Sequence, residues 1–159
     1  MNVAQLLEAG RVRFEPQASS KKQALDVLSE TLTDGHADLT AGVVLDGLVS
    51  RERLGSTALG DAVAMPHARI EGIEQSRGAF LRLGNSIDFE APDGKAVDLL
   101  FGLLMPLDCS DNEIGDLRQL IKHLRDPILQ EQLRQTDSPE DLYALLTDSL
   151  TAVYRRINI

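Results

Sequence analysis

Apolar residues that recur at helical spacing predict two helices in the first third of the chain. The first begins after Ser20, which stands three residues before Gln23 as in a capping box, and it ends at Gly35. The second begins at Asp38 or Thr40. Its buried face is predicted to contain Val44, Leu45 and Leu48.

Shorter apolar stretches predict strands. Val12 and Phe14 alternate with arginines, which is typical of a short edge strand. Residues 62–65 form an apolar strand that Pro66 ends, because proline cannot donate a hydrogen bond to a sheet. The sequence therefore places the next residue, His67, at the rim of a sheet.

The middle of the chain contains two longer strand candidates. Residues 78–83 form the first, and the Gly-Asn-Ser stretch at 84–86 is predicted to turn the chain after it. Residues 97–105 form the most apolar stretch, as expected of a strand that is buried on both faces. Pro106 ends this strand.

Three helices are predicted after that strand. Ser110 and Glu113 have capping-box spacing before the first, and Pro127 begins a short second helix. Ser138 caps the last helix, whose apolar residues are Leu142, Leu145, Leu146, Leu150 and Val153. Helices, then strands, then helices predict a single α/β domain over residues 1–159, built as a sandwich of sheet and helices.

Composition narrows the class of protein. The chain has 159 residues, 43% of them hydrophobic, and a net charge of −9, which argues against a nucleic-acid-binding protein. One cysteine, Cys109, excludes an internal disulfide. The chain has neither a signal-peptide pattern nor an apolar run of 18 residues, so we expect a cytoplasmic protein without membrane insertion.

His67 is the leading candidate for chemistry. An imidazole is largely neutral near pH 7, and a backbone carbonyl that holds one ring N–H leaves the other nitrogen free to attack. We therefore expect His67 to accept a phosphoryl group. The alternative is an ordinary histidine that happens to follow a proline.

The sequence from Arg51 to His67 resembles the mannitol/fructose-type enzyme IIA domains of the bacterial phosphotransferase system. Their signature is a Gly-rich turn, an apolar run and Pro-His, here residues 60–67. The likeness continues through residues 80–83, 87–89, 93–94, 97–101, Pro106 and 140–143. A free-standing chain of this size resembles the nitrogen-regulatory branch more than the sugar-specific domains.

The resemblance implies a single mixed β-sheet with helices on both faces, the mannitol-type enzyme IIA fold. It implies phosphorylation on Nε2 of His67 by a histidine phosphocarrier protein. The phosphoryl group comes from phosphoenolpyruvate through the relay, so neither a cofactor nor a metal is expected. It further implies that the phosphorylation state regulates targets such as transporters or sensor kinases.

Arg51 matches the arginine that relatives place beside the phosphohistidine, and a guanidinium suits phosphate oxygens. Its alternative is a solvated charge at a helix end. Ser56 and Thr57 are candidate phosphate donors, or they simply form a turn. Arg69 is a candidate donor-protein contact, or a plain surface charge.

Glu113 occupies the position at which many relatives carry a second active-site histidine. If its side chain faces His67, it would hydrogen-bond the imidazole and repel an incoming phosphoryl group. If it instead completes the Ser110 capping box, it needs no chemistry. Three functions stay open: a phosphocarrier, a docking module in which Glu113 weakens phosphotransfer, and a sugar-specific subunit.

The other candidate residues give weaker indications of function. His123 is predicted to be exposed or flanking, and His36 lies in a loop. The three histidines lack metal-site spacing, so no metal is expected. Cys109 has no partner that would indicate redox chemistry.

Overall fold

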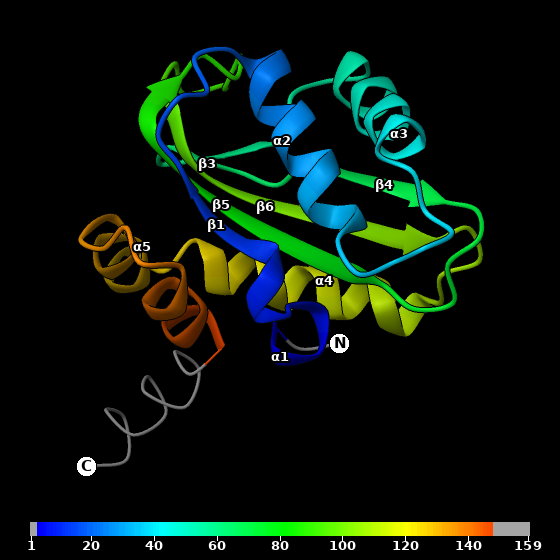
Figure 1. Ribbon diagram of the computed structural model, residues 1–159. Coiled ribbons are helices and arrows are strands. Elements are labelled where there is room, and N and C mark those ends of the chain that lie inside the picture. Colours follow the sequence, from blue (N-terminus) through cyan, green and yellow to red (C-terminus); the bar gives the residue numbers. More distant parts are fainter. Residues whose placement is uncertain (1–2, 148–159) are drawn as a thin grey trace.

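A computed structural model describes residues 3–147 of the chain (Figure 1). In chain order its elements are α1 (Val3–Leu6), the 3-10 helix η1 (Ala9–Arg11), β1 (Val12–Glu15), α2 (Lys21–Thr33), α3 (Ala41–Arg53), β2 (Ala58–Gly60), β3 (Val63–Ala64), β4 (His67–Ile70), β5 (Arg77–Ile87), β6 (Val97–Pro106), α4 (Asp111–Leu124) and α5 (Pro127–Arg134). Residues 139–147 are also helical. The predicted residues Leu150 and Val153 lie outside the described part of the chain.

The six strands form one mixed sheet, as predicted. β1 lies at one edge and pairs in parallel with β5, which confirms the predicted edge strand. β5 pairs antiparallel with β6. The other side of β6 pairs in parallel with two short strands, β3 and then β4, and β2 forms a hairpin with β3. β6 is therefore the central strand, which explains its continuous apolar sequence.

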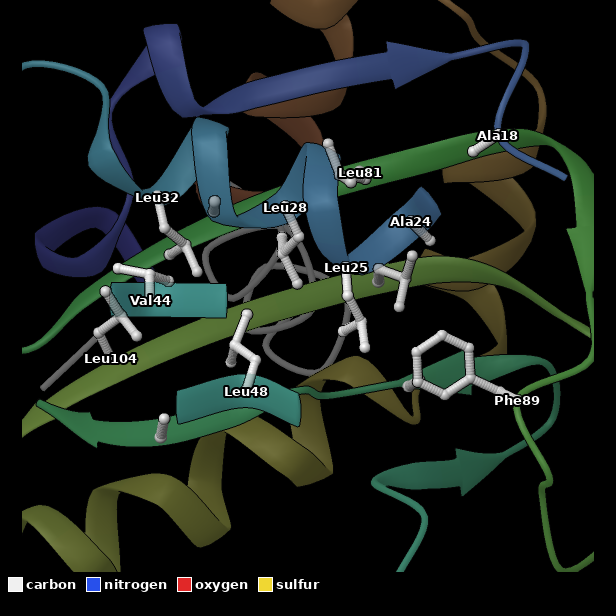
Figure 2. Packing of buried hydrophobic residues seen from close by; sticks show 14 of the residues in the cluster. Ala18, Ala24, Leu25, Leu28, Leu32, Val44, Leu48, Leu81, Phe89 and Leu104 are labelled. Atoms are coloured by element: carbon white, nitrogen blue, oxygen red, sulfur yellow. The ribbon is translucent and has the colours of Figure 1, made fainter. Parts of the chain in front are cut away.

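Helices cover both faces of the sheet (Figure 1): α2 and α3 lie on one face, and α4 and α5 lie on the other. The core beneath α2 and α3 joins leucines of α2 to Val44 and Leu48 of α3 and to Leu81 and Leu104 of the sheet (Figure 2). Gly102 of β6 lets α2 approach the sheet, because a Cβ there would lie 2.7 Å from the Leu28 side chain.

The predicted turn at residues 84–86 is wrong, because β5 continues through it to Ile87. The pairing of β5 with β6 shifts register between Arg82 and Ile87, which accommodates the irregular sequence. Gly84 serves a close backbone approach instead of a turn: a Cβ there would lie 2.9 Å from Cα of Pro16.

The predicted strand at residues 62–65 is shorter than expected, since only Val63–Ala64 is extended and paired as β3. Asp61 and Ala62 form the two-residue turn of the β2–β3 hairpin, with φ of 55° and 67°. Positive φ at both positions is the pattern of a type I′ turn, for which Asn-Gly or Asp-Gly is preferred. Ala62 occupies the position that favours glycine.

Ala62→Gly is expected to raise the free energy of unfolding by about 0.5–1 kcal/mol. Relief of the left-handed backbone at alanine outweighs the extra entropy that glycine gives the unfolded chain. Urea denaturation measures the change. Ala58→Gly, in the extended strand β2, is the control and should lower stability. Equal losses of stability in the two variants would contradict the inference that the backbone at Ala62 is strained.

His123 was predicted to be exposed or flanking, and the first of these two interpretations is wrong. His123 is only 8% exposed, and its Nε2 lies 3.4 Å from the carbonyl oxygen of Leu146. Burial lowers the pKa of His123 below its ordinary value of 6.5, although the Leu146 carbonyl and the charge of Asp126 oppose this. The residue belongs to the packing between α4 and the C-terminal helix.

This burial predicts a pH dependence of stability. Above about pH 6.5 the imidazole is neutral in both the folded and the unfolded chain. As the pH falls below that value, the unfolded chain takes up the proton first, so the free energy of unfolding decreases until the pH passes the lower pKa of folded His123.

His123→Gln should therefore lose stability less steeply than the unchanged protein between pH 6.5 and the pKa of folded His123. Urea denaturation at a series of pH values measures this. At pH 8 the difference in free energy of unfolding between the two proteins gives the effect of the substitution that does not depend on titration of His123. An equally steep decrease in both would contradict the prediction.

Within residues 3–147, no helix is long and apolar enough to cross a membrane. Ser138 caps the final helix as predicted: its Oγ accepts a hydrogen bond from the Asp141 N–H at 3.3 Å. Thr40, one of the two predicted caps, starts α3 by accepting from the Val43 N–H at 3.3 Å.

Candidate active site

His67 is the first residue of β4, and Pro66 separates this strand from β3 on the same side of β6. The Leu103 N–H donates to the Pro66 carbonyl at 3.0 Å, so the proline remains anchored to the sheet although it has no N–H of its own. His67 follows β3 and Pro66, as predicted, and it also begins β4, an additional strand that sequence reasoning missed.

The half-buried imidazole of His67 is fixed at one nitrogen. Its Nδ1 lies 2.8 Å from the carbonyl oxygen of Met65, which only accepts hydrogen bonds. This contact assigns the proton to Nδ1 and leaves a lone pair on Nε2. The geometry thus provides the tautomer that a nucleophilic histidine requires.

The side chain of His67 points away from the core beneath α2 and α3. In β4, Ala68 and Ile70 belong to that core, whereas His67 is half-buried and Arg69 is exposed. Alternation along a strand places His67 and Arg69 on the opposite face. Arg69 is therefore an exposed neighbour of the site, consistent with either of its two interpretations.

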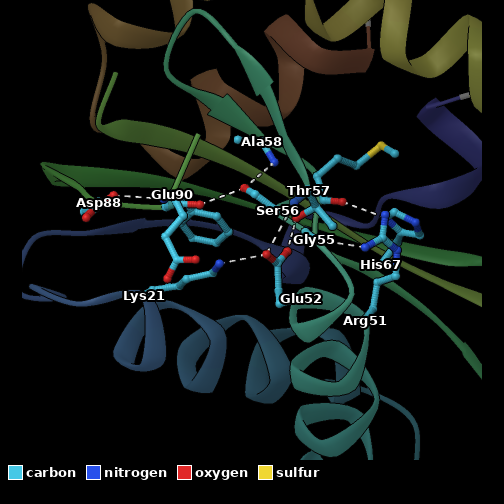
Figure 3. A network of polar contacts seen from close by, with 12 residues as sticks. Lys21, Arg51, Glu52, Gly55, Ser56, Thr57, Ala58, His67, Asp88 and Glu90 are labelled. Atoms are coloured by element: carbon cyan, nitrogen blue, oxygen red, sulfur yellow. Dashed lines mark hydrogen bonds and ion pairs between the residues drawn. The ribbon is translucent and has the colours of Figure 1, made fainter. Parts of the chain in front are cut away.

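Arg51 is held at the end of α3. Its Nη1 donates to the carbonyl oxygen of Gly55 at 2.9 Å, four residues further along the chain. The Met65 N–H donates to the Thr57 carbonyl at 3.0 Å, which ties the loop after α3 to the residues that precede His67. Figure 3 shows Arg51, residues 55–57 and His67 gathered in one place. The structure thus brings together four of the five predicted site residues.

The hydroxyl groups predicted as phosphate donors already have acceptors. The Ser56 hydroxyl donates to the Phe89 carbonyl at 2.7 Å. The Thr57 hydroxyl donates to Glu52, and the Thr57 N–H donates to the same carboxylate at 3.3 Å. A phosphoryl group on His67 would reach these donors only by displacing those contacts. Arg51 is therefore the better placed of the predicted phosphate-binding residues.

Glu52 and Lys21 are the site residues that sequence reasoning missed. The Glu52 side chain is 5% exposed, and its carboxylate lies 2.9 Å from Nζ of Lys21 (Figure 3). In the sequence Glu52 stands between Arg51 and Arg53 and reads as a solvated charge at a helix end. Lys21 lies in the first turn of another helix, so no local pattern indicates their contact.

Glu113 is the fifth predicted residue, and it completes the predicted capping box. The Ser110 N–H donates to its carboxylate at 2.9 Å, and its own N–H donates to Ser110 Oγ at 3.3 Å. With residues 74–76 and α1 it lines a hollow of about 420 Å³. Residues 74–76 lead into β5, whereas β4 lies on the other side of β6. The contacts that the structure describes for Glu113 are thus with its own helix cap and with the lining of this hollow.

Among residues 3–147, no group of three or more histidine, cysteine or acidic residues is arranged to hold a metal ion. The chemistry of the described site rests on the imidazole of His67 with the guanidinium of Arg51 beside it (Figure 3). Such a pair suits an anionic group that forms a bond to nitrogen, because the guanidinium is always charged and its fork matches phosphate oxygens.

Comparison with known proteins defines the class to which this fold and site belong. A sequence model of the family described as phosphoenolpyruvate-dependent sugar phosphotransferase system, EIIA 2, matches residues 5–149. The chain therefore belongs to this family.

Within the family the chain is similar to nitrogen regulatory proteins. It is 34% identical to that of Escherichia coli (strain K12) over 150 residues, which are 94% of this chain and 91% of the relative. The nitrogen regulatory protein of Pseudomonas aeruginosa is 33% identical over 148 residues, 93% of this chain and 96% of the relative.

Solved structures agree with this placement. The crystal structure of nitrogen regulatory protein IIA-Ntr from Neisseria meningitidis matches with a TM-score of 0.83 and 32% identity, over 91% of this chain and 99% of that one. The mannitol IIA of Escherichia coli shares the fold, with a TM-score of 0.71 and 23% identity over 88% of this chain and 98% of that one.

Proposed function

We propose that this protein is a phosphocarrier whose Nε2 of His67 accepts a phosphoryl group from a histidine phosphocarrier protein. The observation that carries the proposal is the 2.8 Å contact between Nδ1 of His67 and the Met65 carbonyl. It keeps the proton on Nδ1, so Nε2 offers its lone pair to an incoming phosphorus atom. Membership of the enzyme IIA family supports the choice of donor.

The transfer balances within the two imidazoles. The lone pair of Nε2 forms a bond to phosphorus as the phosphorus–nitrogen bond of the donor breaks, and the electron pair of that bond returns to the imidazole of the donor. In the phosphohistidine that forms, Nδ1 keeps its proton and continues to donate it in a hydrogen bond to the Met65 carbonyl. The protein contributes in-line positioning and charge stabilisation, and Arg51 supplies the positive charge.

The reaction requires no cofactor of the protein's own, because phosphoenolpyruvate supplies the phosphoryl group through the relay. We place the protein in the cytoplasm, where that relay has its substrate. The names of its relatives support a role in nitrogen regulation. In that role the charge added at His67 would change which target proteins are bound, such as transporters or sensor kinases.

The two alternative functions have less support. A fructose-specific EIIA component from Haloferax volcanii is 26% identical over 137 residues, less than the nitrogen regulatory proteins above. The docking module requires Glu113 to weaken phosphotransfer, yet the carboxylate of Glu113 accepts a hydrogen bond from its own helix cap.

Incubation with phosphoenolpyruvate, enzyme I and histidine phosphocarrier protein tests the proposal. Intact mass spectrometry should show one added phosphoryl group that is labile to acid. His67→Ala should remain unmodified, whereas His36→Ala, the matched control, should still accept one group. No modification of the unchanged protein by donors that phosphorylate another enzyme IIA would overturn the proposal.

Glu113→Ala should lower the free energy of unfolding by about 0.5–1 kcal/mol, because it removes one half of the capping box. Glu113→Gln should retain most of that stability, since glutamine also completes the box. Urea denaturation measures both variants. A faster phosphorylation of His67 in either variant would show instead that the carboxylate repels the phosphoryl group, as the docking-module alternative requires.

A further inference from the structure

A buried carboxylate lies directly beneath the loop of the candidate site. Glu52 accepts from Nζ of Lys21 at 2.9 Å, from the Thr57 N–H at 3.3 Å and from the Thr57 hydroxyl. Lys21 comes from the first turn of α2, and its ammonium also lies 4.8 Å from the centre of the Phe89 ring. Figure 3 shows Lys21, Glu52 and Thr57 converging from α2, α3 and the loop after α3.

The same contacts continue to the imidazole. The Thr57 carbonyl accepts from the Met65 N–H at 3.0 Å, and the Met65 carbonyl lies 2.8 Å from Nδ1 of His67. Hydrogen bonds therefore join Lys21 to Glu52, Glu52 to Thr57, Thr57 to Met65 and Met65 to His67, with the backbone of Thr57 and of Met65 as the covalent steps between them. The buried carboxylate is thus connected to the residue whose carbonyl holds Nδ1 of His67.

We propose that Glu52 is a positioning residue that, with Lys21, holds Thr57 and Met65 so that His67 keeps its proton on Nδ1. For its effect on phosphotransfer this proposal rests on the proposed function above. If the Met65 carbonyl moves away, the imidazole is free to carry its proton on Nε2. That tautomer has no lone pair on the attacking nitrogen and cannot accept a phosphoryl group.

A purely stabilising role accounts poorly for this ion pair. Taking a carboxylate and an ammonium out of water costs free energy that their attraction often only offsets, and apolar replacements of buried pairs are frequently as stable. What such a pair does provide is directional contacts, here two hydrogen bonds to a single residue. Both are directed at Thr57, whose carbonyl accepts the N–H of Met65.

The tautomer of His67 is a readout that a merely structural role would not move. Nitrogen-15 NMR of the imidazole should show Nδ1–H in the unchanged protein. Glu52→Gln places an amide donor in the carboxylate's position, and Thr57→Val removes the hydroxyl donor; both should raise the fraction of Nε2–H. Thr57→Ser should restore the Nδ1–H form, and Lys21→Met should behave like Glu52→Gln.

Two controls separate positioning from general damage. Glu8→Gln removes the carboxylate of another ion pair, with Arg11, whose Nε and Nη2 donate to carbonyls of Gly78 and Leu6. Leu83→Ala destabilises the core beneath α2 and α3, to which Leu83 belongs and Met65 does not. Both controls should keep the Nδ1–H tautomer, whatever they do to stability.

Single-turnover phosphorylation by the phosphorylated donor protein is the second readout. Glu52→Gln and Thr57→Val should react on the order of tenfold to a hundredfold more slowly, while Thr57→Ser stays near the unchanged protein. An unchanged tautomer in Glu52→Gln overturns the proposal. A shifted tautomer in a protein that no donor phosphorylates would leave the positioning role standing and reject the proposed function.

Discussion

Arg51→Met is expected to slow phosphoryl transfer to His67 by about a hundredfold. The reason is that the transferring group spreads negative charge over its oxygens, and removal of a preorganised donor at such a position costs about 10²–10³ in rate. The guanidinium of Arg51 is preorganised by its 2.9 Å bond to the Gly55 carbonyl. Methionine retains a side chain of similar length without the charge or the donors.

Rapid-quench measurement of the first turnover, with limiting phosphorylated donor, gives this rate. Arg53→Met is the matched control, because Arg53 is an exposed arginine in the same last turn of α3. Replacement of Arg53 should have little effect on the rate of phosphoryl transfer to His67. Arg51→Lys should be intermediate, since lysine keeps the charge and loses the planar fork. Equal slowing in the Arg51 and Arg53 variants would indicate a general electrostatic effect and reject a specific role for Arg51.

Phe101→Ala is expected to lower the free energy of unfolding by about 3–5 kcal/mol. Large-to-small replacements of buried aromatic residues fall in this range because a cavity adds to the lost burial. Phe101 lies on the central strand β6 and is 0% exposed. Its ring packs on Gly78 of β5, where an added Cβ would lie 2.9 Å from the ring.

Urea denaturation, followed by circular dichroism, measures the loss. Leu107→Ala is the control, because Leu107 is a large apolar residue just after the same strand that is 56% exposed. Its replacement should change stability by no more than about 0.5 kcal/mol. A loss below about 1 kcal/mol for Phe101→Ala would mean that the sheet face beneath α4 is not packed as described.

Helix positions could be predicted because their signals lie within a few residues of one another. Ser20 caps α2 through the Gln23 N–H, as predicted, although the side chain of Gln23 accepts from Ser19 and not from Ser20. Ser110 and Glu113 form both bonds of their box. Apolar spacing then located the buried faces of these helices, as in Val44 and Leu48.

Strand boundaries were harder to predict, because a strand is defined by what it pairs with. Residues 84–86 have turn-forming side chains, yet Gly84 lies against Pro16 and β5 continues past it. β4 was missed because only its pairing with residues 103–106 of β6 makes it a strand. The burial of His123 likewise depends on the C-terminal helix, which the spacing on α4 alone does not indicate.

By itself, the sequence determined the mixed α/β class, the family, and the candidates His67 and Arg51, because each is encoded in a contiguous pattern or a short motif. Only the tertiary structure decided that Glu52 and Lys21 lie beneath the site and that the hydroxyl groups of Ser56 and Thr57 already have acceptors. The physical reason is the separation along the chain over which each kind of interaction acts. Periodicity and capping act over a few residues, whereas the hydrogen bonds that orient His67 join segments that meet only after the chain has folded.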